Sequence, residues 1–213
     1  MTDAGPEATP RRRASRLARV QATRTQVLNA ATDLFLSQGY VATTMGDIAA
    51  AAGVAVQTLY LRFGSKAQLL KECFDVAVVG DDQPIPLAER TWVEQLKQEP
   101  RLNESLKLLV RNSQAILERA VPLYTSIEQA AADPEVAELL IEVKRQKLEM
   151  VGVFASMLLS KTGYNRRVSL PEATDLLYAI GSEELYRLLC IERGWSGDRW
   201  KQFVLGSLSD LLS

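Results

Sequence analysis

The chain has 213 residues, a formal net charge of −1 and no histidine. Its composition, 47% hydrophobic and 24% charged, is that of a globular protein with a sizeable core. Without histidine, Ser/His/Asp triads, Cys/His dyads and histidine-ligated metal sites are excluded.

The N-terminal segment is basic and punctuated by proline. Residues 1–10 are small and polar, and residues 11–23 are rich in arginine. We predict a disordered basic arm over residues 1–19, although the arginine-rich part could instead extend the first helix. The arginines could contact a DNA minor groove or remain solvated. No apolar segment follows them, so we expect no signal peptide.

Three short helices are expected next. Apolar residues recur at helical spacing from Val27 to Phe35, and Gly39 ends that helix. Thr44 and Asp47 have the spacing of a capping box for a second helix that stops at Gly53. The third helix, over about 56–63, carries only a narrow apolar stripe. The residues expected to form the core of these helices are Leu34, Phe35, Ile48, Leu59 and Phe63.

A fourth helix starts at a second capping box, Ser65 to Gln68, and extends to about Val79. The sequence "GDDQPIP" (80–86) then reads as a linker, with the domain boundary there or slightly earlier. We therefore predict an N-terminal domain over 20–79 and a C-terminal domain over 80–213.

The C-terminal part is predicted to contain helices alone. Apolar residues have a helical period, alternating β-branched runs are absent, and proline and glycine mark the breaks. The predicted segments are 87–98, 102–120, 122–132, 134–161, 171–191 and 196–212. Cys73 and Cys190 lie far apart and form no CxxC motif, so we expect two buried, reduced thiols rather than a disulfide. The fold class is thus all-α.

Charge is divided unevenly between these two parts. Up to Asp75 there are nine basic and six acidic residues, and beyond it sixteen basic and twenty acidic. A basic front and an acidic back predict different tasks for the two domains.

The second and third helices, joined by a glycine turn, make a helix-turn-helix, a unit that docks its second helix in the DNA major groove. Glutamine, threonine and arginine can bond base edges, and tyrosine and lysine suit phosphates. The first turn of the fourth helix offers backbone N–H groups to an anion. The predicted DNA-contacting residues are Thr43, Thr44, Gln57, Thr58, Tyr60, Arg62 and Lys66.

Over about residues 20–75 the chain resembles the TetR family of bacterial transcriptional regulators. The resemblance rests on "AATDLFLSQGYVATTMGDIAAAAGVAVQTLYLRFGSKAQLL", which has the family's conserved elements in order and at the right spacing. Two positions depart from it. Ala55 stands where a capping serine is usual, and Arg62 stands where the family often has histidine or tyrosine.

The resemblance implies a function for the whole chain. Family members are all-helical homodimers that bind palindromic operators, usually repress, and release DNA when a small molecule enters the C-terminal domain. They dimerise through their two final helices, expected here near 171–191 and 196–212. A ligand that tilts the fourth helix would change the separation of the two recognition helices. No cofactor and no metal are expected, and the location is expected to be cytoplasmic, on the nucleoid.

A pocket for a hydrophobic or amphipathic effector is expected among the helices from 102 to 161. Polar and aromatic side chains on these mostly apolar stretches are the candidates, although each could equally serve the core or the surface. The candidate effector-binding residues are Trp92, Asn112, Tyr124, Arg145, Phe154 and Tyr178.

Three other classes of protein are alternatives to a regulator. An enzyme is disfavoured, because the chain has no Walker A motif, no GxGxxG and no metal-ligand cluster. A DNA-binding protein of the same fold that acts on the nucleoid or in cell division would bind many sites without an effector. A helical interaction module that has lost DNA binding is disfavoured by Tyr60 and Lys66. A regulator remains the main prediction.

Overall fold

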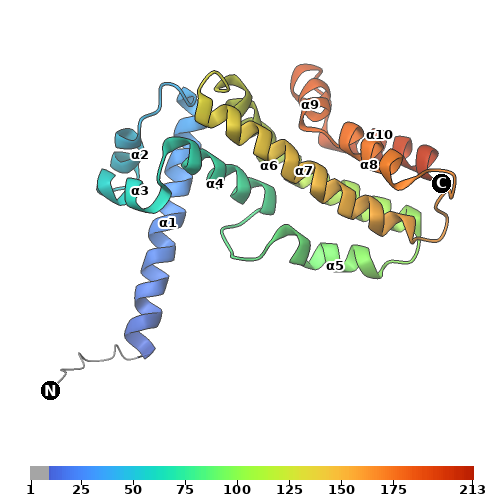
Figure 1. The fold of residues 1–213 in the computed structure, drawn as a ribbon, viewed down its shortest axis with the longest axis horizontal. Coiled ribbons are helices and arrows are strands. Elements are labelled where there is room, and N and C mark those ends of the chain that lie inside the picture. The colour runs from blue at the N-terminus through green and yellow to red at the C-terminus, as the bar shows by residue number, and fades with distance from the viewer. Residues whose placement is uncertain (1–9) are drawn as a thin grey trace. The chain divides into compact units, whose positions relative to one another are not determined.

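The computed structural model describes the backbone of residues 10–213 and the side chains of residues 18–213. Figure 1 shows that the described chain is built from helices, which confirms the predicted all-α fold. Within residues 10–213 there is no strand, only an isolated bridge between Arg101 and Thr162. No helix in this part of the chain is long and apolar enough to cross a membrane.

The chain divides into two compact units, one up to Cys73 and one from Phe74 to Ser213. The division falls inside the fourth helix, α4 (Lys66–Val79), and not in the linker that follows it. The helix keeps the bounds expected from the sequence. Its apolar residues continue past the boundary, so the backbone has no reason to break where the packing partners change.

The N-terminal unit contains α1 (Pro10–Gln38), α2 (Met45–Ala51), α3 (Val56–Phe63) and the first part of α4. Residues 10–19 are helical, so the disordered arm expected over 1–19 is corrected for that stretch. Proline is favourable in the first turn of a helix, where its missing N–H would have no partner. Residues 1–9 of the expected arm lie outside the described residues.

The core of this unit is small and agrees with the sequence. Phe35, Ile48, Leu59 and Phe63 are buried, whereas Leu34 is half-buried. Burying side chains of this size contributes about 1.5–3 kcal/mol each. Since α2 and α3 are too short to be stable alone, the packing of α2 against α1 and of α3 against α2 holds them in place.

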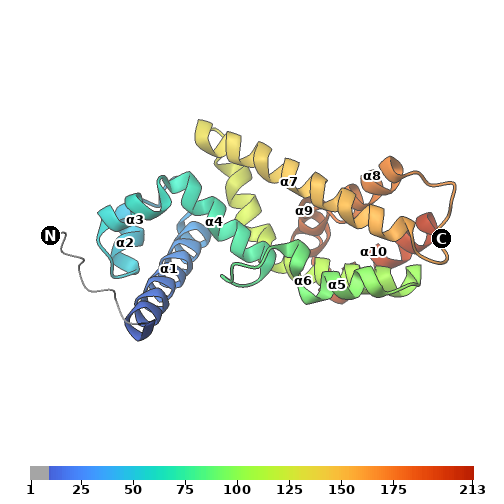
Figure 2. The same ribbon diagram turned by 60° about the horizontal axis from the view of Figure 1, so that its bottom comes forward.

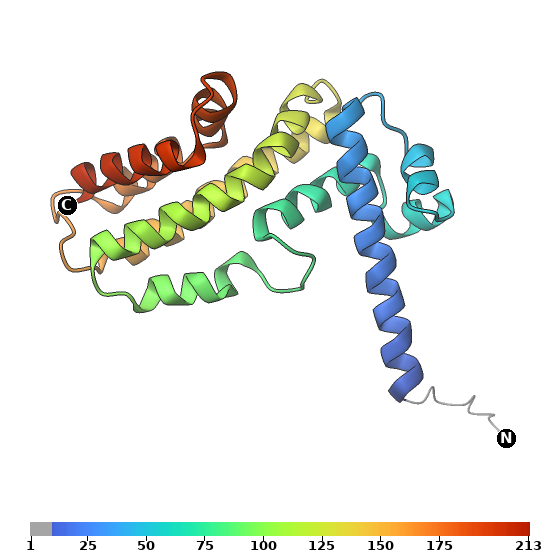
Figure 3. The ribbon, with the colours of Figure 1, turned by 180° about the vertical axis from the view of Figure 1, so that it is seen from behind.

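The C-terminal unit begins with the last part of α4, which a 3₁₀ turn, η1 (Leu87–Glu89), and α5 (Thr91–Gln98) follow. Two long helices follow, α6 (Leu102–Gln129) and α7 (Pro134–Leu159), which lie side by side (Figure 3). The last elements are α8 (Leu170–Ile180), α9 (Glu183–Tyr186), the π-helical η2 (Arg187–Glu192) and α10 (Gly197–Leu212). In Figure 2, α8 lies along α7; α10 contacts both α6 and α8.

Three predicted segments differ from the structure. The segments 102–120 and 122–132 form one helix, α6, with Pro122 inside it. An interior proline costs about 3 kcal/mol, but Leu123, Tyr124 and Ile127 continue the buried face beyond it and outweigh that cost. Conversely, the segment 171–191 is interrupted at Gly181, where a new helix starts with Ser182 as its N-cap.

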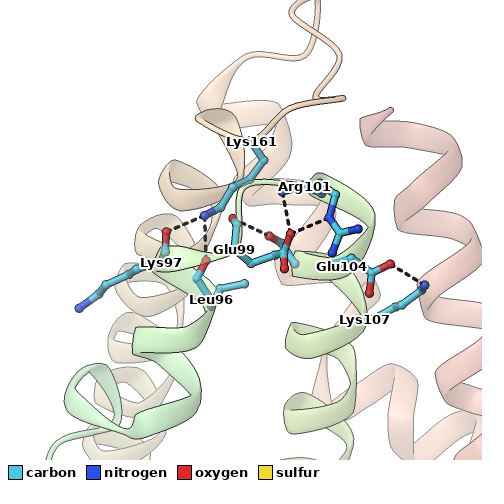
Figure 4. A network of polar contacts seen from close by, with 8 residues as sticks. Leu96, Lys97, Glu99, Arg101, Glu104, Lys107 and Lys161 are labelled. Carbon is cyan, nitrogen blue, oxygen red and sulfur yellow. Dashed lines mark hydrogen bonds and ion pairs between the residues drawn. The ribbon is translucent and has the colours of Figure 1, made fainter.

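A buried lysine fixes the connection between α5 and α6. Lys161 Nζ donates to the carbonyl oxygens of Leu96 and Lys97 at 2.8 and 2.9 Å, the last turn of α5 (Figure 4). A cation at a helix C-terminus satisfies carbonyls that have no partner within the helix. Burial lowers the pKa of Lys161. The neighbouring Glu99–Arg101 pair is more exposed and contributes little.

Candidate DNA-binding surface and ligand cavity

The start of α2 is held by the capping box that the sequence predicted. Thr44 Oγ1 accepts from the Asp47 N–H at 3.1 Å, and Asp47 Oδ2 accepts from the Thr44 N–H at 3.1 Å. The bonds from the Thr44 side chain and backbone lower the pKa of Asp47. After α2, Gly53 has φ +62°, a conformation that favours glycine. The chain therefore turns sharply enough to lay α3 against α2.

The outer face of α3 matches the prediction. Leu59 and Phe63 face the core, while Gln57, Thr58 and Arg62 are exposed and Tyr60 is 54% exposed. These side chains offer amide, hydroxyl and guanidinium groups from one short helix, as a base-reading surface requires.

Leu61 is a surface residue that sequence reasoning missed. It is 91% exposed, the most exposed large apolar side chain of those described. It lies four residues after Gln57 and three after Thr58, so helical spacing could have placed it on the same face. An apolar contact with a thymine methyl group is open to it.

Thr43 is the clearest correction among the predicted DNA contacts. Its side chain is fully buried, and its hydroxyl donates to the carbonyl oxygen of Gly39 at 2.8 Å, with the Leu34 carbonyl oxygen 3.2 Å away. A hydroxyl engaged in the interior is not presented to DNA. Thr44 is exposed, but its hydroxyl belongs to the capping box.

Lys66 lies in the first turn of α4, as expected, but its ammonium points into its own unit. Nζ donates to the carbonyl oxygens of Tyr40 and Thr43 at 2.8 Å each and lies 4.0 Å from the centre of the Tyr40 ring. These contacts bind the loop between α1 and α2 to α4. They give Lys66 a positioning role in place of the predicted phosphate contact.

The recognition helix α3 lacks a side-chain cap. Ala55 occupies the N-cap position and makes no side-chain hydrogen bond there. What holds α3 is packing and the ion pair of Arg24 with Glu72, in which the Arg24 guanidinium also lies 5.9 Å from the Phe63 ring centre.

The C-terminal unit contains a cavity of about 540 Å³, the size of a site for a small molecule. Its wall is mainly apolar. It is formed by the end of α4, by α6 and by α7, and includes Phe74, Val78, Ile116, Leu117, Met150 and Phe154. The polar groups at its wall include Ser113 and an ion pair between Lys147 and Glu183, whose side chains are only 15% and 11% exposed.

A second, smaller chamber of about 80 Å³ adjoins this cavity. The two share Ser113, Val151, Phe154 and Gly181 in their walls. The remainder of the small chamber includes Trp200 and neighbouring apolar residues of α10. The two cavities therefore share part of their walls, and the smaller one lies against the last helix.

Residues 27–73 match the model for bacterial regulatory proteins of the tetR family. This stretch covers the helix-turn-helix described above, with Thr44, Gly53 and Phe63 in their expected places. The helix-turn-helix domain is therefore similar to that of the tetR family. The resemblance inferred from the sequence is confirmed.

Solved structures share the fold over nearly the whole chain. One is NalD of Pseudomonas aeruginosa, the secondary repressor of the MexAB-OprM multidrug efflux pump, with 24% identity, a TM-score of 0.67 and coverage of 90% of this chain and 96% of that one. Another is FadR of Bacillus subtilis in complex with stearoyl-CoA, with 18% identity, a TM-score of 0.67 and coverage of 87% and 97%. A third is the fatty acid degradation regulator FadR of Bacillus halodurans, with 20% identity, a TM-score of 0.65 and coverage of 87% and 93%. No curated protein shows a significant sequence match.

Of the six predicted effector residues, Phe154 alone lines the large cavity. Trp92 packs behind it, with ring centres 5.5 Å apart. Asn112 donates to the Leu108 carbonyl within its own helix. Arg145 is exposed and pairs with Glu142 and Glu149, so its charge is satisfied at the surface.

The two tyrosines serve the packing around the cavity. Tyr124 is buried and donates to Glu184 at 2.8 Å, and burial raises its pKa. Tyr178 lies under the ammonium of Lys147, 4.5 Å from the ring centre. The sequence analysis did not predict Lys147 and Met150 as cavity residues. They lie seven and four residues before Phe154, on the same face of α7. Helical spacing from Phe154 would have found them.

Proposed function

We propose that this tetR-family protein is a transcriptional repressor that binds a palindromic operator as a homodimer and is released by a small molecule. The observation that carries the proposal is the exposed polar face of α3, with Gln57, Thr58 and Arg62, in the helix-turn-helix of a tetR-type domain. Base-reading side chains grouped on an eight-residue helix have little structural use, since the helix is stabilised from its other face.

The operator is tested by capturing genomic fragments on the purified protein and sequencing what binds. We expect a few sites that share an inverted repeat, and loss of enrichment in Gln57→Ala with Tyr60→Ala. Gln129→Ala, an exposed glutamine on α6, is the matched control. Many scattered sites without a shared repeat would favour a nucleoid-associated protein instead.

The effector is proposed to be an apolar or amphipathic molecule held in the large cavity. The mainly apolar wall and the volume of about 540 Å³ support this class. NalD represses a multidrug efflux pump, and the Bacillus subtilis FadR was solved with stearoyl-CoA. Substrates of multidrug pumps and fatty acyl-CoA molecules are therefore the first compounds to screen. A hit should weaken operator binding by the wild type and act less on Phe154→Ala.

The dimer is proposed to form through α10 and the segment before it. Apolar side chains are exposed there in the single chain: Leu188, Ile191, Phe203 and Leu211. Trp200, Val204 and Leu208 of α10 are buried within the monomer, as is Leu177 of α8. Ile191→Glu with Phe203→Glu should shift the sedimenting species from dimer to monomer, whereas Ile141→Glu on α7 should not.

Release is proposed to pass through α4. Its last residues, Phe74 and Val78, line the cavity, and its first residue, Lys66, holds the loop that precedes α2. A bound molecule that tilts α4 would alter the separation of two recognition helices, which must match half-sites about 34–36 Å apart. The distance between the two α3 helices of the dimer is measured with spin labels, once with effector bound and once with operator bound. Equal distances in the two states would reject release through α4.

A further inference from the structure

The indole N–H of Trp200 is a buried hydrogen-bond donor that no described residue satisfies. Trp200 is 0% exposed, and its Nε1 has no hydrogen-bond partner among the described side chains and backbone. Buried polar groups in native proteins are nearly always paired, so an orphaned donor needs a specific explanation. A tryptophan that served packing alone would be more stable with its N–H bonded to a carbonyl oxygen than with the N–H left unpaired.

The position of Trp200 supplies that explanation. It forms part of the wall of the small chamber, which shares Ser113, Phe154 and Gly181 with the large cavity. The rest of that chamber's lining is mostly aliphatic, including Leu109, Val110, Leu177 and Leu208. The chamber's volume of about 80 Å³ admits a few atoms at most. A polar end of a ligand fits there, while its apolar body occupies the larger space.

A second aromatic ring holds the indole in place. The Tyr186 ring packs edge-on against Trp200, with centres 5.3 Å apart and an interplanar angle of 64°. Tyr186 is buried as well. A donor fixed in this way loses little conformational freedom when it binds an acceptor.

We propose that the effector carries a hydrogen-bond acceptor oxygen, such as a ketone, ester or ether, that accepts from Trp200 Nε1 in the small chamber. Recognition of an acceptor by a buried donor is selective, because a ligand without the oxygen leaves the donor unpaired. Hydrocarbons of the same shape then bind less well than their size predicts. The inference rests on the proposed function only in assigning the two chambers to the effector.

The test compares hexanophenone with hexylbenzene, which have the same phenyl and hexyl skeleton with and without the carbonyl oxygen. The protein variant replaces Trp200 by benzothienylalanine, in which sulfur takes the place of the N–H and the ring shape is kept. Trp195, which packs on Phe203 outside both chambers, receives the same replacement as the control. Dissociation constants are measured by calorimetry on the full chain.

We expect the ratio of ketone to hydrocarbon affinity to fall about five- to ten-fold in the Trp200 variant and to stay constant in the Trp195 variant. Comparing ratios cancels the different water solubilities of the probes and any general loss of packing. In nitrogen-correlated NMR spectra, the indole signal that the Trp200 variant lacks should shift when the wild type is saturated with hexanophenone.

An unchanged ratio, or an indole signal that does not move, would overturn the inference and assign the partner of the N–H to water. Binding of neither probe would also overturn it. Operator release is measured separately. A ratio that changes as expected while hexanophenone leaves operator binding intact would reject the proposed regulation and keep the recognition by Trp200.

Discussion

Lys66 Nζ lies 2.8 Å from the carbonyl oxygen of Tyr40 and 4.0 Å from the centre of its ring. Together with the bond to the Thr43 carbonyl, this contact fixes the loop that leads into α2. The orientation of the recognition helix depends on that loop, so Lys66 affects DNA binding through the fold of the domain.

Lys66→Met should therefore lower the free energy of unfolding by about 2–3 kcal/mol, since two carbonyls lose a charged donor. Urea unfolding followed by circular dichroism measures the change. Lys107→Met, which removes only an exposed ion pair with Glu104, should have little effect. Unchanged stability with a salt slope of operator binding reduced by about 0.9 would instead place Lys66 on a phosphate.

Thr43 and Thr58 should respond in opposite ways to the same substitution. Thr43→Val removes a buried hydroxyl that donates to the Gly39 carbonyl oxygen and should cost about 1–2 kcal/mol of stability. Thr58→Val alters an exposed side chain and should leave stability within about 0.5 kcal/mol. If Thr58 contacts a base, Thr58→Val should nevertheless weaken the free energy of operator binding by about 1–3 kcal/mol. Equal stability of both variants would contradict the buried role of Thr43.

Ala55→Ser should stabilise the protein. The N-cap of α3 has no side-chain hydrogen bond, and a serine hydroxyl there would accept from a free N–H in the first turn. The expected gain is about 1 kcal/mol, seen as a higher melting temperature. Ala51→Ser, at the end of α2, is the control and should give no gain. A loss of stability at position 55 would show that the helix start cannot receive a hydroxyl.

Cys73 should be unreactive in the folded protein. Burial raises the pKa of its thiol to about 12, so iodoacetamide at pH 8 should modify it only after unfolding. Because the folded pKa lies above the ordinary thiol value of about 8.5, its contribution to stability is complete below that pH. It is lost as pH rises toward about 12.

The Cys73→Ala variant provides the comparison for this pH dependence. The stability difference between wild type and variant should be constant below about pH 8.5 and shrink above it. A difference that does not change up to pH 11 would contradict the raised pKa. Both cysteines are free thiols, as expected, although Cys190 is half-buried rather than buried.

Local signals predicted the elements of the N-terminal domain well. The Thr44–Asp47 capping box, the Gly53 turn and the apolar residues of α3 each act within a few residues, so their pattern is readable along the chain. The interior proline of α6 and the break at Gly181 were predicted wrongly. Both depend on which neighbouring helix buries the face beyond them.

The sequence by itself determined the all-α class, the helix-turn-helix and the polar face of α3, because these follow from helical periodicity, caps and a glycine turn. Only the tertiary structure decided that Thr43 and Lys66 point inward, that Phe154 faces a cavity and that Arg145 does not. It also decided that the Trp200 N–H is buried with no hydrogen-bond partner among the described residues. Each of these depends on residues distant in sequence, whose approach is set by the packing of whole helices and not by any local preference.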